Sequence, residues 1–376
     1  MSLPVQDVIV IGGGLHGLSA ALQLARSGQR VLVLERAWVG RHASGATAAG
    51  VRTLGRDLAE IPISLESMEM WHNIEKIVGD SCGFHAHGQI RVAERESDIP
   101  TLRQRLETAV SLGYRHEELI DRAELRRLVP ALSLHCVAGL IARRDGAADP
   151  HRTLAAFRRA AEAAGVTILE GHGVTAIERQ AADWRVSAGK KRFVTPVLVN
   201  AAGAWAAQIA AMVGEIIPLS HKASMMIVTE RLEPLLNPVV SAEGRPLSFK
   251  QSDQGTLVIG GGLQGKADVM AQKSTVDFME LARGAAAAAA LFPMVRDVRI
   301  TRSWTGIEAK TRDLLPVLGA STVASGLFHS FGYSGHGFQL APVCGAIIRD
   351  LVIDGGTNRP IAAFSPERLM NKRVAA

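Results

Sequence analysis

The stretch Val8-Ile-Val-Ile-Gly-Gly-Gly-Leu-His-Gly17, followed by Val31-Leu-Val-Leu-Glu35, decides the fold. Its two apolar runs, rich in β-branched residues, are typical of buried parallel strands. The glycines between them satisfy G-x-G-x-x-G, and apolar residues at helical spacing follow as far as Gly28. Strand, glycine loop, helix, strand and a terminal acid in this order predict a dinucleotide-binding βαβ unit.

The residue types of this motif suit phosphate and ribose binding. Gly12 permits a tight turn, Gly14 lets the backbone approach a pyrophosphate, and Gly17 allows the helix to pack closely on the strand. The free N–H groups of the helix N-terminus attract the phosphates. Glu35 ends the second strand, where it can accept hydrogen bonds from ribose hydroxyls. His16 lies inside the motif and either contacts the cofactor or fills space beside it.

A second glycine motif, Val258-Ile-Gly-Gly-Gly-Leu-Gln-Gly265, nearly repeats the first and would suit a second dinucleotide such as NADPH. Its context differs, because charged and polar residues occupy 266–272, where an apolar helix face should begin. Arg283 stands where the ribose-binding acid is expected. We interpret this motif as a strand that ends in a glycine loop and binds no phosphate, so a valine at Gly262 should leave cofactor binding intact.

The composition is that of a soluble protein with a large core: 376 residues, 47% hydrophobic and 21% charged. The basic residues are scattered and the net charge is only +6, so we expect no nucleic-acid partner. Cys82, Cys136 and Cys344 lie far apart, which predicts buried thiols and neither a disulfide framework nor a metal site. Without a leader-like or membrane-spanning run we expect a cytoplasmic protein, and peripheral membrane association stays open.

The segment after the second strand indicates which dinucleotide is bound. Gly40–Arg52 is rich in small residues, which suits a chain that runs under the large planar ring of FAD; the alternative is a flexible surface loop. Near the C-terminus, the glycines of 332–337 precede an expected helix over 343–352. The N-terminus of that helix can stabilise negative charge on a reduced flavin.

These segments resemble the D-amino-acid oxidase group of FAD-dependent amine oxidoreductases, which includes glycine oxidase, sarcosine oxidase and D-amino-acid dehydrogenase. The resemblance covers nearly the whole chain, and 217–230 with 249–261 is most similar to members like the sarcosine oxidase β-subunit. The segments that carry it are 9–35, 43–52, 200–205, 304–319 and 332–342.

The resemblance implies an α/β plus α+β fold of the glutathione-reductase-2-like type. A discontinuous Rossmann-like FAD-binding domain would comprise 1–83, 145–217 and 304–376. An antiparallel-sheet substrate-binding domain would comprise 84–144 and 218–303. The sequence pattern itself indicates helices over 98–112, 122–128 and 276–291.

We expect FAD to be bound without a covalent link, because no cysteine lies in 304–316 and Cys344 falls within the final helix. The motifs and the resemblance together predict that FAD is contacted by Gly12, Gly14, Leu15, His16, Gly17, Glu35, Arg36, Ala43, Ser44, Gly50, Val51, Val174, Ala202, Gly203, Trp205, Gly306, Gly335, His336, Gly337, Phe338 and Gln339.

The implied activity is hydride transfer from a CH–NH bond of an amine or amino acid to flavin N5, with release of an imine. The electron acceptor stays open between O2 and a quinone or partner subunit, as does assembly into a hetero-oligomer. Because the cofactor supplies the chemistry, we assign no catalytic acid–base pair, and the chain has no G-x-S-x-G elbow. A competing hypothesis is a catalytically idle FAD-binding subunit of a heteromeric complex.

Four side chains are candidates for the substrate side of the flavin: Arg52, Lys250, Glu308 and Tyr333, each with an ordinary structural role as the alternative. Glu308 is the most informative, because carboxylate-binding relatives place an arginine there, in a G-x-R-P-like segment after the tryptophan. An acid at this position reverses the charge and would select a substrate with a positive group. The alternative is an internal ion pair with Arg302 or Lys310.

We expect the purified protein to be yellow with FAD, and not FMN or NAD, because the first glycine motif and the small-residue segment both suit this cofactor. Acid or heat should release the flavin without proteolysis. Absorbance of pellet and supernatant after precipitation, with chromatography of the released flavin, checks both points. Flavin that stays with the pellet would contradict non-covalent binding, and a colourless protein that takes up no FAD would refute the cofactor assignment.

Overall fold

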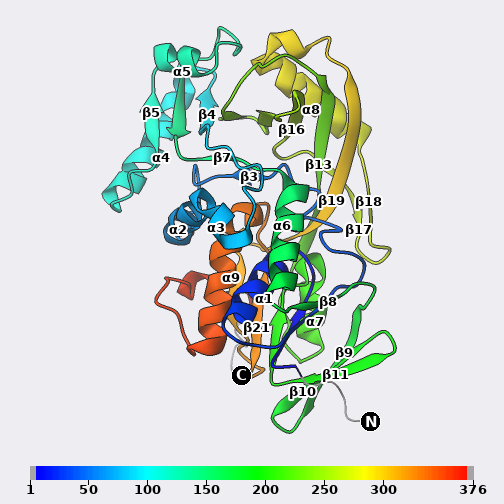
Figure 1. The fold of residues 1–376 in the computed structure, drawn as a ribbon. Coiled ribbons are helices and arrows are strands. Elements are labelled where there is room, and N and C mark those ends of the chain that lie inside the picture. Colours follow the sequence, from blue (N-terminus) through cyan, green and yellow to red (C-terminus); the bar gives the residue numbers. More distant parts are fainter. Residues whose placement is uncertain (1–5, 371–376) are drawn as a thin grey trace, which may run out of the picture.

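The computed structural model describes residues 6–370, and a six-stranded sheet forms its nucleotide-binding half (Figure 1). The strands follow the order β20-β21-β12-β1-β2-β8, with β20 antiparallel to its neighbour and the other pairs parallel. Their bounds are β1 Val8–Ile11, β2 Val31–Leu34, β8 Thr167–Leu169, β12 Val197–Asn200, β20 Val317–Ala320 and β21 Leu327–Phe331. Ile11 is level with both Leu34 and Asn200, so the residues that follow these three strands meet at one edge.

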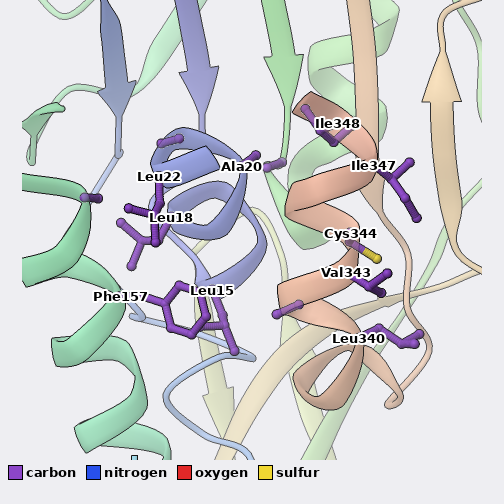
Figure 2. Close-up of a cluster of buried hydrophobic side chains, with 14 of the residues drawn as sticks. Leu15, Leu18, Ala20, Leu22, Phe157, Leu340, Val343, Cys344, Ile347 and Ile348 are labelled. Carbon is purple, nitrogen blue, oxygen red and sulfur yellow. The ribbon is translucent and has the colours of Figure 1, made fainter. Parts of the chain in front are cut away.

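Beside this sheet, α1 Leu15–Arg26 packs against two other helices: α6 Pro150–Ala163 and α9 Gly337–Ile353. In Figure 2, Leu15 and Leu18 of α1 lie on the side of Phe157 of α6, and α9 contributes residues such as Val343 and Ile347 to the same buried cluster. A Cβ on Gly345 of α9 would lie 2.2 Å from Ser19 Oγ of α1, so only glycine permits this approach. Each fully buried leucine in such a cluster contributes about 1.5–3 kcal/mol to stability.

A second, ten-stranded sheet forms the other half. Its strands follow the order β18-β17-β13-β16-β15-β14-β4-β6-β5, and β19 also pairs with β13. In Figure 1 the long strands β13 and β19 run side by side from this sheet towards α1 and α9. The bounds are β4 Gln89–Ala93, β5 Glu118–Ile120, β6 Ala138–Ala142, β13 Ser220–Arg231, β14 Val239–Ala242, β15 Ser248–Gln251, β16 Thr256–Gly260, β17 Gln264–Asp268, β18 Lys273–Thr275 and β19 Ile300–Lys310.

The remaining elements are short strands and helices around these two sheets. A three-stranded sheet contains β9 Val174–Gln180, β10 Asp183–Ala188 and β11 Lys191–Thr195, and a two-stranded ladder pairs β3 Gly50–Val51 with β7 Gly146–Ala147. The other helices are α2 Ile61–His72, α3 Ile74–Val78, α4 Ile99–Ser111, α5 Arg122–Leu128, α7 Ala206–Ala211 and α8 Phe278–Leu291, with 3-10 turns η1 Glu96–Asp98, η2 Gly203–Trp205, η3 Pro293–Val295, η4 Ala362–Phe364 and η5 Pro366–Leu369.

The fold agrees with the sequence prediction of an α/β plus α+β protein in most elements. The second glycine motif leads from β16 directly into β17, and no helix follows it, as predicted. The final helix predicted over 343–352 is confirmed, but it begins six residues earlier: α9 starts at Gly337 and contains Pro342, where the glycines and the proline indicated a loop. The three cysteines are buried and free, as predicted.

The boundaries of the two domains stay a prediction. The strands of the six-stranded sheet all lie in the segments assigned to the FAD-binding domain. The boundary predicted at 303/304 falls inside the continuous strand β19. Within residues 6–370, no helix has the length and apolar character needed to cross a membrane.

The buried carboxylate of Glu215, in the segment after α7, is hydrogen-bonded to β21 and to the turn that precedes it. Glu215 Oε2 lies 2.7 Å from His329 Nε2 and 2.5 Å from Ser321 Oγ, and Glu215 Oε1 accepts from Thr322 N at 3.0 Å. Burial alone would raise the pKa of Glu215, but the hydrogen bonds from His329, Ser321 and Thr322 lower it to about 2. The carboxylate is therefore ionised at neutral pH and stabilises the strand that leads into the C-terminal glycine loop.

Glu215→Gln should lower the free energy of unfolding at pH 7 by about 3 kcal/mol, because it removes one partner of a buried polar cluster. The pKa of Glu215 lies below its ordinary value in the folded state, so this stabilisation should be lost as the pH falls from about 4.5 towards 2. Urea unfolding at several pH values measures both effects. Glu178→Gln, at a side chain that is 64% exposed, is the control and should stay within about 0.5 kcal/mol. Equal losses in the two variants would contradict this role.

Candidate active site

A cavity of about 420 Å³ lies at the edge where β1, β2 and β12 end, in the size range of small-molecule sites. Its walls come from both halves of the molecule: the β1–α1 turn, the small-residue segment Gly40–Arg52, the strands β13 and β19, and the loop 332–337 before α9. The predicted FAD-binding residues that line it are Gly12, Gly14, Leu15, His16, Glu35, Arg36, Ala43, Ser44, Gly50, Val174, Ala202, Gly203, Trp205, Gly306, Gly335, His336, Gly337 and Phe338.

The glycine motif is held tightly at this edge. A Cβ on Gly12 would lie 2.5 Å from Ala201 O, and a Cβ on Gly17 would lie 1.9 Å from Gly12 O, so both positions require glycine. Gly14 caps α1 with an extended backbone and no side chain, so no cap side chain occupies the N–H groups of the first turn, of which Leu15 N is bonded to Ser44 Oγ. Glu35 accepts from Gly13 N at 2.7 Å and from Ala37 N at 2.8 Å, which holds its carboxylate at the cavity.

The small-residue segment is anchored on both sides and is not the free surface loop of the alternative interpretation. Ser44 Oγ accepts from Leu15 N at 3.0 Å, and Ala46 O accepts from Trp304 Nε1 at 2.9 Å. A Cβ on Gly306 of β19 would lie 2.3 Å from Ala46 Cβ, so the small residues on both sides let the segment pack directly on β19. The segment therefore bridges the two sheets across the cavity.

Aromatic and basic side chains gather at the end of the cavity beside Trp205. The Arg36 guanidinium lies 4.4 Å from the centre of the Trp205 ring, and the His42 ring lies 4.5 Å from it. Burial, with the charges of Arg41 and Arg36, lowers the pKa of His42 to about 4. These planar groups provide stacking surfaces next to the segment that contains Val174, one of the predicted FAD contacts.

Two rings support the glycine loop before α9. The His16 ring stacks on Tyr333 with centres 3.7 Å apart, and His16 Nε2 lies 2.9 Å from Gly337 O. Burial lowers the pKa of His16 to about 3, so this histidine is neutral. The Tyr333 hydroxyl lies 2.8 Å from Ser330 Oγ. Both predicted residues line the cavity and also pack internally.

A buried ionic cluster lies next to this loop. Arg52 lines the cavity and donates Nη1 to Leu54 O at 2.5 Å; burial, with the charges of Arg56 and Arg91, lowers its pKa to about 9. Arg56 also lines the cavity and donates to His336 O at 3.2 Å.

The same cluster influences the protonation state of His336. The buried carboxylate of Glu60 lies 3.3 Å from His336 Nδ1. Burial nevertheless lowers the pKa of His336 to about 4. Arg56 and Glu60 could not be predicted as site residues, because nothing in the sequence shows that the start of α2 packs against the loop before α9.

Four predicted residues do not line the cavity: Gly17, Val51, Gln339 and Lys250. Gly17 acts through helix packing, and Gln339 uses its side-chain oxygen to accept from Arg56 and Ser64, both at 3.2 Å. Lys250 is directed to Ala148 O at 3.2 Å, and burial lowers its pKa to about 8. The ammonium group of Lys250 therefore has a partner within the protein and lies outside the lining of this cavity.

Glu308 lines the cavity, but its ion-pair partner differs from both expected residues. β13 and β19 place Lys222 directly opposite Glu308, with Lys222 Nζ 3.3 Å from Glu308 Oε1, and Ser224 Oγ donates to the same oxygen. Arg302 instead lies over the Trp304 ring, 5.2 Å from its centre. Lys222 and Ser224 could not be predicted as neighbours of Glu308, because the register between two strands that lie far apart in the chain cannot be inferred from either strand alone.

Comparisons with known proteins agree with this geometry. Residues 7–351 match the model of the DAO family, described as FAD dependent oxidoreductase. The chain is 28% identical to the β-subunit of a sarcosine oxidase of Rhizobium meliloti, over 97% of this chain and 88% of that protein. It is also 28% identical to a subunit of the opine oxidase of Agrobacterium tumefaciens, over 96% of this chain and 97% of that protein. The solved structure of L-proline dehydrogenase from P. horikoshii superposes with a TM-score of 0.91 at 26% identity, covering 98% of each chain.

The bare glycine turn, the acid at the end of β2 and the open helix N-terminus together define a site for a flavin dinucleotide. The chain belongs to the DAO family of FAD-dependent oxidoreductases. Its fold class, its enzymatic nature and its FAD cofactor are thereby confirmed, while the contacts of individual residues with FAD stay predictions.

Gly14→Val should weaken FAD binding by at least about tenfold, equivalent to about 1.4 kcal/mol, because the new side chain would fill the space that the pyrophosphate approaches. The fold should survive, since the nearest atom to a Cβ there is Ser44 Oγ at 3.2 Å, the end of a side chain. Fluorescence titration of the apoprotein with FAD measures the change.

The matched control for this test is Gly356→Val, at an exposed glycine whose Cβ would meet no atom within 4 Å. Gly262, the control that the sequence suggested, is unsuitable because its φ is 115° and its Cβ would lie 2.9 Å from Pro246 Cβ. Equal FAD affinity in Gly14→Val and Gly356→Val would show that the first motif does not bind the cofactor.

Proposed function

We propose that the protein oxidises an amine or amino acid at a CH–NH bond and releases the imine. The observation that carries this proposal is one cavity that joins the dinucleotide turn to a wall of charged side chains: Arg52, Lys222 and Glu308. When bound, FAD accepts a hydride at N5. Relatives whose names specify sarcosine, opine and glycine oxidases support a substrate of this class.

The residues of this chain would orient the substrate and stabilise the reduced cofactor. The N-terminus of α9 has no side-chain cap and faces the cavity through Gly337 and Phe338, which places a partial positive charge there. His16 and His336 are neutral because burial lowers the pKa of each. These side chains therefore contribute hydrogen bonding and packing, and the charges on the substrate wall come from Arg52, Lys222 and Glu308.

We further propose that the protein works in a hetero-oligomer. Several relatives are named as subunits of larger enzymes, among them the β-subunit of sarcosine oxidase and a subunit of opine oxidase. The electron acceptor would then be a partner subunit or a quinone, with O2 as the alternative for an independent oxidase. The cytoplasm is the proposed location, and the domains are proposed at 1–83, 145–217 and 304–376 for FAD and at 84–144 and 218–303 for the substrate.

The test is an anaerobic screen of amines and amino acids with the FAD-loaded protein. At least one compound should bleach the oxidised flavin absorbance within seconds to minutes, and mass spectrometry should detect the imine or its carbonyl hydrolysis product. Reoxidation with O2 or with a quinone then identifies the acceptor. Flavin that stays oxidised across the panel, in a protein that purifies with a fixed partner, would instead support the idle FAD-binding subunit.

A further inference from the structure

His336 differs from the other histidines of the cavity because it faces an acid. Within residues 6–370, the histidines that line the cavity are His16, His42 and His336. Among these three, His336 alone pairs with a carboxylate: its Nδ1 lies 3.3 Å from Oε2 of Glu60, whose side chain is fully buried. A carboxylate at Nδ1 favours the tautomer that carries its proton there, which leaves Nε2 as a proton acceptor.

The His336 ring can be reached from the cavity on its other edge. Its Nδ1 is buried, whereas the side chain as a whole is 22% exposed, so the exposed part of the ring lies away from Glu60. His336 is also the cap residue of α9, the helix whose N-terminus faces the cavity through Gly337 and Phe338. A proton can therefore enter from the cavity while Glu60 holds the opposite edge of the ring.

The contacts within this cluster leave capacity for one more positive charge. Arg56 Nη1, both carboxylate oxygens of Glu60 and His336 Nδ1 are buried without a hydrogen-bond partner in the described part of the chain. Arg56 Nη1 approaches Glu60 Oε2 only to 4.0 Å. Burial raises the pKa of Glu60, but His336 and Arg56 lower it below its ordinary value, so the acid is ionised. A proton on His336 would give this buried carboxylate a second cation.

The surrounding charges keep His336 neutral until an anion arrives. Burial lowers the pKa of His336 to about 4; Glu60 opposes this effect, and the charges of Arg56 and Arg52 add to it. Oxidised flavin has an uncharged ring and does not alter this balance. A negative charge in the cavity favours the protonated imidazole, because opposite charges stabilise each other.

The remaining neighbours add no net charge at this position. Lys222 and Glu308 approach the same loop, since a Cβ on Gly335 would lie 2.9 Å from Lys222 Nζ and 3.9 Å from Glu308 Oε2, but the two are paired with each other at 3.3 Å. Tyr333 and His16 stack on each other. Burial raises the pKa of Tyr333 and lowers that of His16, so both are neutral. The balance therefore depends on the two arginines and the one acid of the cluster.

We propose that His336, with Glu60 as its counterion, takes up one proton when FAD is reduced and releases it when FAD is reoxidised. A hydride brings two electrons and one proton to the flavin ring and leaves one negative charge there. One proton from water binds His336 and balances that charge. On reoxidation the acceptor receives the two electrons, and both protons leave with them. The inference goes beyond the proposed oxidation and depends on FAD, with no requirement for a particular substrate.

The test follows the histidine side chains by nuclear magnetic resonance in the FAD-loaded protein, labelled with 15N-histidine. The protein is titrated with acid in the oxidised state and again after anaerobic reduction with dithionite. The titration midpoint of His336 should rise by at least about one pH unit on reduction, a tenfold gain in proton affinity. His336→Asn identifies the signal by its loss, and His336→Gln replaces it if the first variant does not retain FAD. An unchanged midpoint, or a rise at His16 instead, would overturn the proposal.

His329 is the matched internal control, because it also faces a buried carboxylate, that of Glu215, but does not line the cavity. Its signals should be the same in both redox states. Glu60→Gln should reduce the rise at His336 by at least about half a pH unit, about threefold in proton affinity, because the counterion is lost. An undiminished rise in Glu60→Gln would refute the role of Glu60.

The midpoint potential of FAD gives an independent measurement. Binding linkage requires that a proton taken up on reduction make the potential fall more steeply with pH in the wild type than in His336→Asn. Equal pH dependence would contradict the proposal. Because dithionite reduces FAD without an amine, the result does not depend on the substrate. A wild type that shows the rise at His336 but is reduced by no amine would refute the proposed oxidation alone.

Discussion

The close approach of Gly12 to Ala201 is the constraint on which the other walls of the cavity depend. Because β1 lies between β2 and β12 in register, the turn after β1 must pass directly over the start of the β12 loop. A Cβ at Gly12 would lie 2.5 Å from a backbone oxygen that cannot move without breaking this register. The turn thereby fixes where α1 begins, and the packing of α1 on α9 then fixes the loop that carries His336.

The two halves of the molecule meet at the cavity through continuous strands. β13 and β19 belong to the ten-stranded sheet, and their paired ends place Lys222 and Glu308 beside the cofactor-binding half. There, the backbone of Lys310 forms an isolated β-bridge with Tyr333. The small-residue segment crosses in the opposite direction and receives a hydrogen bond from Trp304 of β19. Cofactor-binding and substrate-binding walls are therefore built from the same elements, so a change of strand register would displace both.

The sequence predicted what depends on local order, and missed what depends on distant pairing. The βαβ turn could be recognised because strand, glycines, helix and Glu35 follow one another within a short segment. Lys222 and Arg56 reach the cavity, and Glu60 contacts His336, only through the approach of segments far apart in the chain, which no local pattern encodes. Glu308, singled out by its place after Trp304, lines the cavity, and its role towards a substrate stays a prediction; its partner depends on the β13–β19 register.

The charge state of the cavity follows from this arrangement. Burial lowers the pKa of His16 to about 3 and of both His42 and His336 to about 4, so these three histidines are neutral around pH 7. The charged side chains that line the cavity are therefore those of arginine, lysine and glutamate. The fold also sets where each charge lies, because the β13–β19 register places Lys222 opposite Glu308, and the segment before α2 places Arg56 beside the loop before α9.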